Sequence, residues 1–221
     1  MAITKVTGAL LGNYTGGSAD DTVVIGDGAG DAITTGTDNT FIGDNAGSAT
    51  TTASNNVAVG SSAMIANTTG TENTAVGSAA LDANTTGNYN TGIGYNSLTG
   101  NTTGERNNAV GYGTLAANTT ASYNTAMGHS ALYANTTGAN NTAFGNDALT
   151  ANTTASHNTA LGSGALDTNT TGANNVAVGS RSLQANTTAS NNTAVGYDSL
   201  YANTTGANNT AFGRDALAAN T

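Results

Sequence analysis

The sequence predicts an all-β fold, a parallel β-solenoid of 17-residue coils, and three observations predict it. One glycine recurs every 17 residues from Gly26 to Gly213, with no insertion or deletion. The segment before each glycine alternates in character, as in Thr74-Ala75-Val76, which is the period of a β-strand. The Asn-Thr-Thr segments that follow are rich in turn-forming residues. Copies of one fixed length stack most simply as the coils of a solenoid.

The composition excludes several classes of function. The 221 residues include 42 Thr, 40 Ala, 32 Asn and 30 Gly, about two-thirds of the chain, and they include no Cys, Pro or Trp. Zinc clusters, disulfide frameworks and thiol nucleophiles that depend on cysteine are therefore excluded. The net charge of −9 disfavours nucleic acid as a partner. No stretch of about 20 apolar residues is present, so we expect no membrane insertion.

Two apolar columns run through the repeat and predict its core. The residue before each glycine is always apolar, and a second apolar residue follows four positions after the glycine, except at Gly30 and Gly47. The β-branched residues of the first column suit a half-buried pleated surface. Because burial of large apolar side chains stabilises a coil, we expect both columns to face inward. The predicted structural core contains Ile93, Val110, Phe144, Val178 and Val195 from the first column and Leu81, Leu115 and Leu149 from the second.

The asparagines of the Asn-Thr-Thr segments are expected at tight corners between strands, where Asn and Gly accept positive φ. Stacking the coils would place Asn over Asn, and such columns of asparagine can satisfy one another by hydrogen bonds. These segments are also N-glycosylation sequons, but glycans on every coil would collide. The corner interpretation is therefore favoured, and it points to a bacterial or viral source.

We divide the chain into an N-terminal non-repeat segment, residues 1–20, that docks or caps the rod, and a β-solenoid of about twelve repeats, residues 21–221. Acidic residues gather near this boundary. Calcium could use their carboxylate oxygens, but the spacing is not that of calcium-binding nonapeptide repeats. A solvated acidic cap is the favoured interpretation, since solenoids need polar terminal coils. The acidic residues are Asp20, Asp21, Asp27, Asp31, Asp38 and Asp44.

The small number of large apolar residues predicts association of chains. Each 17-residue coil offers one large residue in each apolar column, which is little burial for the backbone entropy lost on ordering the coil. Association around a shared apolar axis would supply more burial, so we predict a homo-oligomer.

The unit N-T-A-V-G-x-x-A-L-x-A-N-T-T-G, as in residues 73–87, resembles the head repeats of trimeric autotransporter adhesins. It is also similar to Asn/Thr-rich arrays in phage tail-fibre-like proteins. The resemblance covers residues 26–221, although the 17-residue unit is longer than the usual adhesin repeat. It implies a trimeric left-handed β-roll with Val76, Val110, Val178 and Val195 in the core. It also implies a structural or adhesive fibre protein, located on a virion or outside the cell.

Surface residues suggest attachment rather than catalysis. Five tyrosines in variable slots are expected to face outward, where they could bind a host-surface glycan or protein: Tyr95, Tyr112, Tyr133, Tyr197 and Tyr201. His129 and His157 are 28 residues apart, not a multiple of 17, so we expect two separate surface histidines. No acid–base pair or nucleophile interrupts the repeat, so we expect no enzyme activity and no cofactor.

Two other functions stay open. Asn84 and Thr86 would lie on one strand face and stack into regular polar rows, which would suit an ice-binding solenoid. A self-assembling extracellular filament is the third possibility, and micrographs that show indefinite end-to-end growth rather than rods of one length would favour it.

Overall fold

The computed structural model describes residues 22–221, and this part of the chain forms a single parallel β-solenoid without any helix. The predicted segment 1–20 lies outside the described residues. Each coil contributes one strand of three residues. The strands are β1 (Val23–Ile25), β2 (Thr40–Ile42), β3 (Val57–Val59), β4 (Thr74–Val76), β5 (Thr91–Ile93), β6 (Asn108–Val110), β7 (Thr125–Met127), β8 (Thr142–Phe144), β9 (Thr159–Leu161), β10 (Val176–Val178), β11 (Thr193–Val195) and β12 (Thr210–Phe212).

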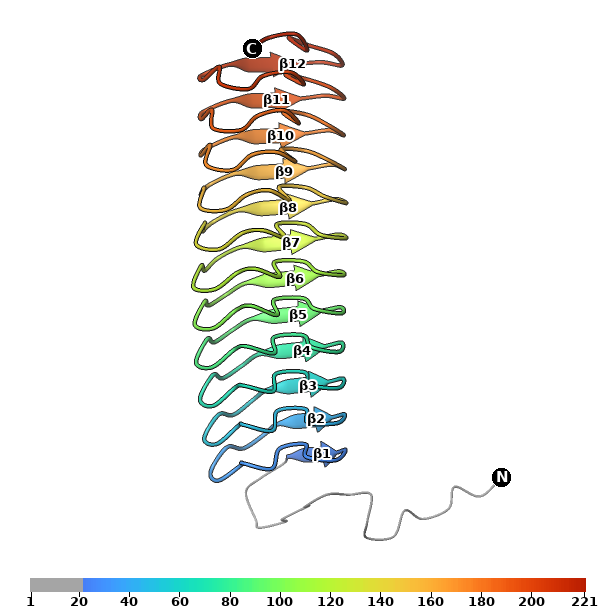
Figure 1. Cartoon of the computed structure of the whole chain (residues 1–221), viewed down its shortest axis with the longest axis vertical. Helices are drawn as coiled ribbons and strands as arrows, with labels where there is room; N and C mark the ends of the chain where they lie inside the picture. Colours follow the sequence, from blue (N-terminus) through green and yellow to red (C-terminus); the bar gives the residue numbers. More distant parts are fainter. Residues whose placement is uncertain (1–21) are drawn as a thin grey trace, which may run out of the picture.

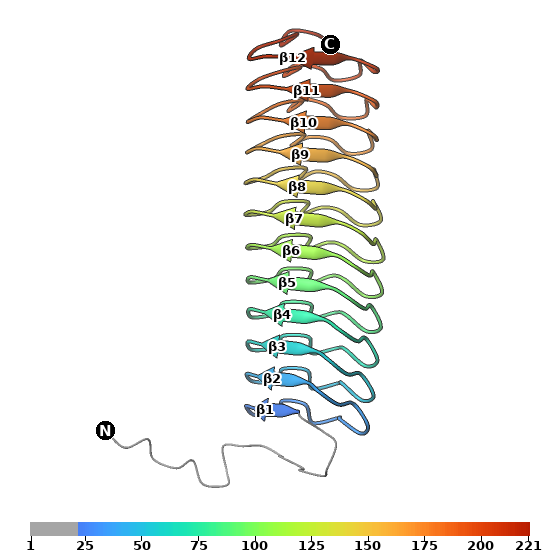
Figure 2. The same ribbon diagram turned by 180° about the vertical axis from the view of Figure 1, so that it is seen from behind.

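The strands stack in chain order into one parallel sheet, and every pair is in the same register (Figures 1 and 2). Thr74 pairs with Thr91 and Val76 pairs with Ile93, so each residue lies beside the one 17 positions later. The backbone outside the strands continues this pairing, since Leu81 N donates to Ser97 O at 3.0 Å. At the usual separation of paired strands, twelve layers make a rod roughly 50–55 Å long. The predicted β-solenoid of 17-residue coils is confirmed.

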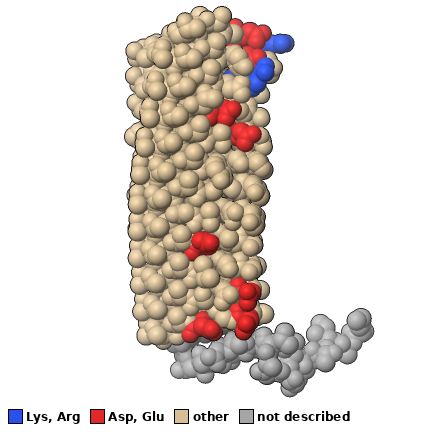
Figure 3. All heavy atoms as spheres, in the orientation of Figure 1, with Lys and Arg blue, Asp and Glu red and all other residues tan. Residues whose placement is uncertain are grey.

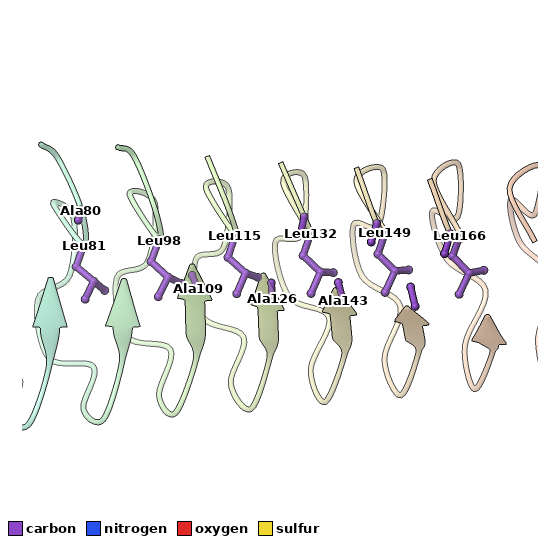
Figure 4. Packing of buried hydrophobic residues seen from close by; sticks show 14 of the residues in the cluster. Ala80, Leu81, Leu98, Ala109, Leu115, Ala126, Leu132, Ala143, Leu149 and Leu166 are labelled. Atoms are coloured by element: carbon purple, nitrogen blue, oxygen red, sulfur yellow. The ribbon is translucent and has the colours of Figure 1, made fainter. Parts of the chain in front are cut away.

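The core of each coil is made of small residues from the strand and one large residue from the return segment. The middle residue of a strand points inward, so Ala75 and Ala109 are fully buried. The leucine four positions after the column glycine packs against this alanine, and Figure 4 shows the leucines stacked in a row beside the strands. Leu81, Leu115 and Leu149 are fully buried, as the sequence predicted.

The first apolar column lies on the other face of the sheet, so its assignment to the core of the chain was wrong. Alternation places the first and third residues of each strand on the same side, opposite the buried alanine. The coil is narrow, and the space between strand and leucine admits only a small side chain. A Cβ at Gly92, in the alanine column, would already be 3.0 Å from Ser97 Oγ. The outward residues are Ile93, Val110, Phe144, Val178 and Val195, with Val76 in the same column.

The corners depend on positive φ at the leucines of the second apolar column, a conformation that the sequence analysis did not predict. Leu81 has φ 52° and Leu98 has φ 52°, and the leucines of later coils share this conformation. A bulky residue in the left-handed region costs roughly 1–2 kcal/mol, so burial of the leucine side chain must offset that cost. By contrast, Asn84 and Gly87 of the Asn-Thr-Thr-Gly corner do not adopt positive φ.

The column glycines are required by both conformation and space. Gly77 has φ 134°, a region open almost only to glycine. A Cβ placed on Gly77 would be 2.6 Å from the carbonyl oxygen of Gly94 in the next coil. The 17-residue glycine period therefore records a close backbone contact between successive coils.

Candidate functional site

The outer face of the sheet carries an apolar surface along the described rod. We call the first and third residues of the twelve strands, which lie opposite the buried alanines, the outer sheet face. The third residues form the valine column and the first residues form the threonine column. The valine column follows the whole rod without a polar residue: Ile25, Ile42, Val59, Val76, Ile93, Val110, Met127, Phe144, Leu161, Val178, Val195 and Phe212. The threonine column lies beside it: Val23, Thr40, Val57, Thr74, Thr91, Asn108, Thr125, Thr142, Thr159, Val176, Thr193 and Thr210.

Side chains of the valine column remain accessible in the single chain. Ile93 is 39% exposed, Met127 is 47% exposed and Phe144 is 37% exposed. Contiguous exposed apolar surface of this extent is uncommon on monomeric proteins and marks an interaction surface. The outer sheet face is therefore the first candidate functional site.

Two buried columns of asparagine hold the coils beneath this face in register. In the Asn-Thr-Thr column, Asn84 Nδ2 donates to Asn67 Oδ1 at 2.9 Å and to Gly87 O at 3.1 Å. In a second column, immediately before the strands, the backbone N–H of Asn90 donates to Asn73 Oδ1 at 2.9 Å. Both columns are buried, so these bonds are shielded from water. The predicted stacking of asparagines is confirmed, and a second column was not foreseen.

A second candidate site is an aromatic stack just after the strands. The strand-exit column contains the residues that follow the column glycines, and Tyr95, Tyr112 and His129 are successive members of it. Tyr95 and Tyr112 stack with ring centroids 5.5 Å apart, and Tyr112 and His129 stack at 5.1 Å with ring planes 5° apart. All three are exposed. His129 Nδ1 also lies 3.9 Å from Asp147 Oδ1.

A matching group lies just before the same strands. The strand-entry column contains the residues two positions before each strand, and Tyr89, Arg106 and Tyr123 are successive members of it. The Arg106 guanidinium lies between the two rings, 4.9 Å from the centroid of Tyr89 and 5.6 Å from that of Tyr123. Arg106 Nη1 also donates to Tyr123 Oη at 3.2 Å and to Glu105 Oε2 at 3.3 Å.

A third group surrounds Arg181 near the C-terminal end of the rod. Its guanidinium lies 4.9 Å from the Tyr197 ring centroid and 5.3 Å from that of Tyr201. Arg214 lies over Tyr197 as well, at 5.4 Å. The hydrogen bond from Arg181 to Asp198 raises the pKa of the guanidinium above its ordinary value. These cations already have anionic or aromatic partners within the chain.

Charged residues elsewhere among residues 22–221 include two half-buried carboxyl groups. Burial raises the pKa of Asp82, and burial also raises the pKa of Asp167 despite a hydrogen bond from Gln184. On the face seen in Figure 3, charged side chains gather toward the two ends and a middle stretch carries none. Within residues 22–221, no three His or acidic side chains are grouped as metal ligands. Asp20 and Asp21 of the predicted acidic cap lie outside the described residues.

The structure separates the predicted surface residues into different columns. Tyr95, Tyr112 and Tyr197 lie in the strand-exit column, whereas Tyr133 and Tyr201 follow the leucines. All five are exposed, as predicted: Tyr95, Tyr112, Tyr133, Tyr197 and Tyr201. His129 and His157 lie in the strand-exit and strand-entry columns respectively, apart from one another as expected.

The proposed pair of polar rows for ice binding is not formed. Thr86 is exposed, but Asn84 is fully buried, because its amide is used inside the coil. The same burial removes the sequon asparagines from glycosylation in the folded chain. The prediction failed because the Asn-Thr-Thr segment bends at a corner, so alternate residues do not share a flat face.

The strand-entry group was missed by the sequence analysis, although the signal was present. Tyr89, Arg106 and Tyr123 are 17 residues apart, so aligning the repeats places them in one column. That this column borders the outer sheet face could not be read from the alignment, because the direction of the corner was unknown.

No protein-family model, curated protein or solved structure matches this chain. The described part of the chain, residues 22–221, also contains no helix with the length and apolar character of a membrane span.

Proposed function

We propose that this protein is a structural and adhesive fibre protein, a rigid rod of a phage tail fibre or a similar surface appendage that mediates attachment. Its work is mechanical rather than catalytic: the rod holds a binding surface away from the particle that carries it. The proposal places the protein on a virion or at a cell surface. It includes three chains and a left-handed coil, both of which rest on the resemblance of the repeat.

The observation that carries the proposal is the unbroken apolar valine column on the outer sheet face. Because the chain presents this column along its whole length, burial requires an equally long and equally regular partner. A parallel copy of the same chain meets that requirement, since its own valine column has the same spacing. Three outer sheet faces that meet around one axis would bury all twelve layers.

The interior of the coil supports a mechanical role. Buried asparagine columns and parallel backbone pairing run the length of the rod, so bending must disturb many hydrogen bonds at once. Tyr133, Tyr197 and Tyr201 are exposed and remain for contact with a host-surface glycan or protein, since aromatic rings with a polar hydroxyl are common in binding surfaces.

The molar mass in solution tests the proposal. Sedimentation equilibrium of the full chain should give a mass three times that of the 21.5 kDa chain. Electron micrographs of the same sample should show straight rods of one length rather than filaments that grow end to end. A stable monomer at tens of micromolar protein would contradict the proposal.

Ice binding is a second candidate, now at a different surface. The threonine column lies outward on a flat parallel sheet, beside the apolar valine column, so the outer sheet face presents regularly spaced hydroxyl and methyl groups. A thermal hysteresis assay separates the two functions. Freezing-point depression by a monomeric protein would favour ice binding.

A further inference from the structure

We propose that the aromatic groups beside β5, β6 and β7 form an inter-chain seam, in which the strand-exit column of one copy packs against the strand-entry column of the next. This inference rests on the proposed assembly through the outer sheet face. The inference adds which residues of neighbouring copies contact each other beside the outer sheet faces, and in which register.

The first step is that both aromatic groups border the same three strands. Tyr89 and Tyr95 bracket β5, each separated from the strand by one residue. The flanking pair of β6 is Arg106 and Tyr112, and the pair of β7 is Tyr123 and His129. Among β2–β12, no other strand carries an aromatic or cationic residue at both positions. Strands with an aromatic or cationic residue on both sides are therefore confined to the middle of the rod (Figure 1).

The second step is that both groups are exposed and directly adjoin the two ends of the strands that form the outer sheet face. Across β5, exposure alternates: Tyr89 is exposed, Asn90 is buried, Thr91 is half-buried and Ile93 is exposed. Tyr95 continues the exposed positions beyond Gly94. Exposed aromatic side chains therefore adjoin the exposed strand residues at both ends of β5.

The third step follows from rotational symmetry. When copies pack their outer sheet faces around an axis parallel to the rod, the end of each strand adjoins the beginning of the same strand in the next copy. Such an interface is head to tail, so it joins unlike columns: strand-exit against strand-entry. A closed ring has no shift along its axis, so residues of the same layer meet.

The fourth step is chemical complementarity at the three layers. The pairs that meet are Tyr95 with Tyr89, Tyr112 with Arg106, and His129 with Tyr123. Tyr112 has a ring on each side within its own column, so its accessible parts are its edge and hydroxyl. Aromatic edges, hydroxyls and a guanidinium are mutually compatible, and no two like charges meet. By contrast, Asp44 would meet Asp38 at β2, so the seam is favourable at the middle of the rod and not at that end.

Introduced cysteines test the contact directly, since the sequence has no cysteine of its own. In the double variant Tyr89→Cys/Tyr95→Cys, a short bis-maleimide should link the chains into a closed three-chain product. Within one chain these positions lie at opposite ends of β5. A link between them inside one chain would leave that chain monomeric, so only an inter-chain link gives a larger product. Either single variant should give no cross-linked ring.

A matched control tests the register. The variant Tyr89→Cys/Ser163→Cys places the second thiol in the same strand-exit column but four layers further along, about 19 Å away. We expect no cross-link in this variant. Equal cross-linking of the two double variants, or only two-chain products at saturation of the β5 pair, would overturn the seam.

Removal of the aromatic rings tests their contribution to assembly. The variant Tyr89→Asn/Tyr95→Ser/Tyr112→Ser/Tyr123→Asn uses residues that occur in the same columns at Asn140, Asn174, Ser61 and Ser78, so the coil should still form. We expect the dissociation constant of the assembly to rise at least about tenfold, because central aromatic residues dominate many interfaces. The control Tyr133→Thr/Tyr201→Thr should leave it unchanged.

The outcomes separate the two proposals. A wild-type assembly of the expected mass that is neither cross-linked through β5 nor weakened by the four substitutions would refute the seam and leave the proposed function standing. A wild-type protein that stays monomeric would refute the proposed function and the seam with it.

Discussion

Phe41 fills the space that Gly47 leaves empty. Phe41 is the middle residue of β2 and is fully buried, in a column that otherwise holds alanine or glycine from β3 onward. A Cβ on Gly47 would lie 2.8 Å from three atoms of the Phe41 ring, and a Cβ on Gly30 would lie 3.1 Å from its Cδ2. Gly30 and Gly47 are the two positions of the leucine column that lack a large apolar residue, so one aromatic ring fills the space of two such side chains.

This relationship predicts a rescue by a second substitution. Phe41→Ala should destabilise the first coils by about 3–5 kcal/mol, because it leaves a cavity lined by glycines. Gly47→Leu alone should also destabilise, since its side chain would collide with the ring. The double variant should recover much of the loss, because Leu98 shows that leucine tolerates this left-handed position. A double-mutant cycle of hydrogen-exchange protection in β1–β3 measures the coupling, and additive effects would contradict it.

The two apolar columns should respond differently to truncation. Leu115→Ala should cost about 2–5 kcal/mol of local stability, because Leu115 is fully buried among its neighbours. Val110→Ser should change coil stability little, since the residue faces outward, but it should weaken association. Denaturant unfolding of dilute protein and sedimentation of concentrated protein check the two effects. Equal loss of coil stability in both variants would contradict the observed orientation of the strands.

Interruption of an asparagine column should be costly. Asn118 Nδ2 donates to Asn101 Oδ1 at 2.8 Å and to Ala121 O at 3.0 Å, and Asn118 Oδ1 accepts from Asn135. Asn118→Ala leaves the buried Asn101 Oδ1 without a partner, at about 1–3 kcal/mol. Ala121 O still accepts from Asn107 Nδ2, and Asn135 Nδ2 still donates to Gly138 O. Hydrogen exchange should therefore accelerate in β6 and β7. Thr120→Ala, at an exposed position two residues away, is the control and should leave exchange unchanged.

Extension of the same column should stabilise the chain. Thr50 occupies the asparagine position of the second coil, and its buried Oγ1 has no hydrogen-bond partner. Thr50→Asn would provide an acceptor for Asn67 Nδ2, as Asn67 does for Asn84. We expect a gain of about 1 kcal/mol in the first coils. Unchanged or reduced protection of β2 and β3 in hydrogen exchange would contradict this expectation.

The raised pKa values of Asp82 and Asp167 predict that the stability of the fold depends on pH. Burial raises the pKa of both carboxyl groups above 3.8, so the folded state binds their protons more tightly than the unfolded state does. Their contribution to stability is then fully present below pH 3.8 and is lost as pH rises through the folded pKa values. Asp82→Asn/Asp167→Asn should stabilise at pH 7 by less than about 1 kcal/mol, because these groups are only half-buried and solvent screens their charge. Thermal unfolding at pH 7 and pH 3 measures the difference in stability between the double variant and wild type, and no difference should remain at pH 3.

Much of the fold was predictable because the repeat is regular. The 17-residue glycine period predicted the register of every strand pair, since residues in one column must stack. The leucine core and the columns of asparagine followed from the same alignment. The exposed tyrosines followed from the variability of their slots. None of these inferences required knowledge of the path of the chain within one coil.

The path within the coil decided the rest. Alternation in Thr74-Ala75-Val76 establishes that the side chain of Ala75 lies on the opposite face of the sheet from those of Thr74 and Val76. It does not establish which face is the interior. The interior is narrow because the leucine returns close to the strand, so it accepts alanine and turns Val76 outward. The sequence by itself determined the layers and their order. Only the tertiary structure decided which face each column occupies, because that depends on the direction in which the corners turn.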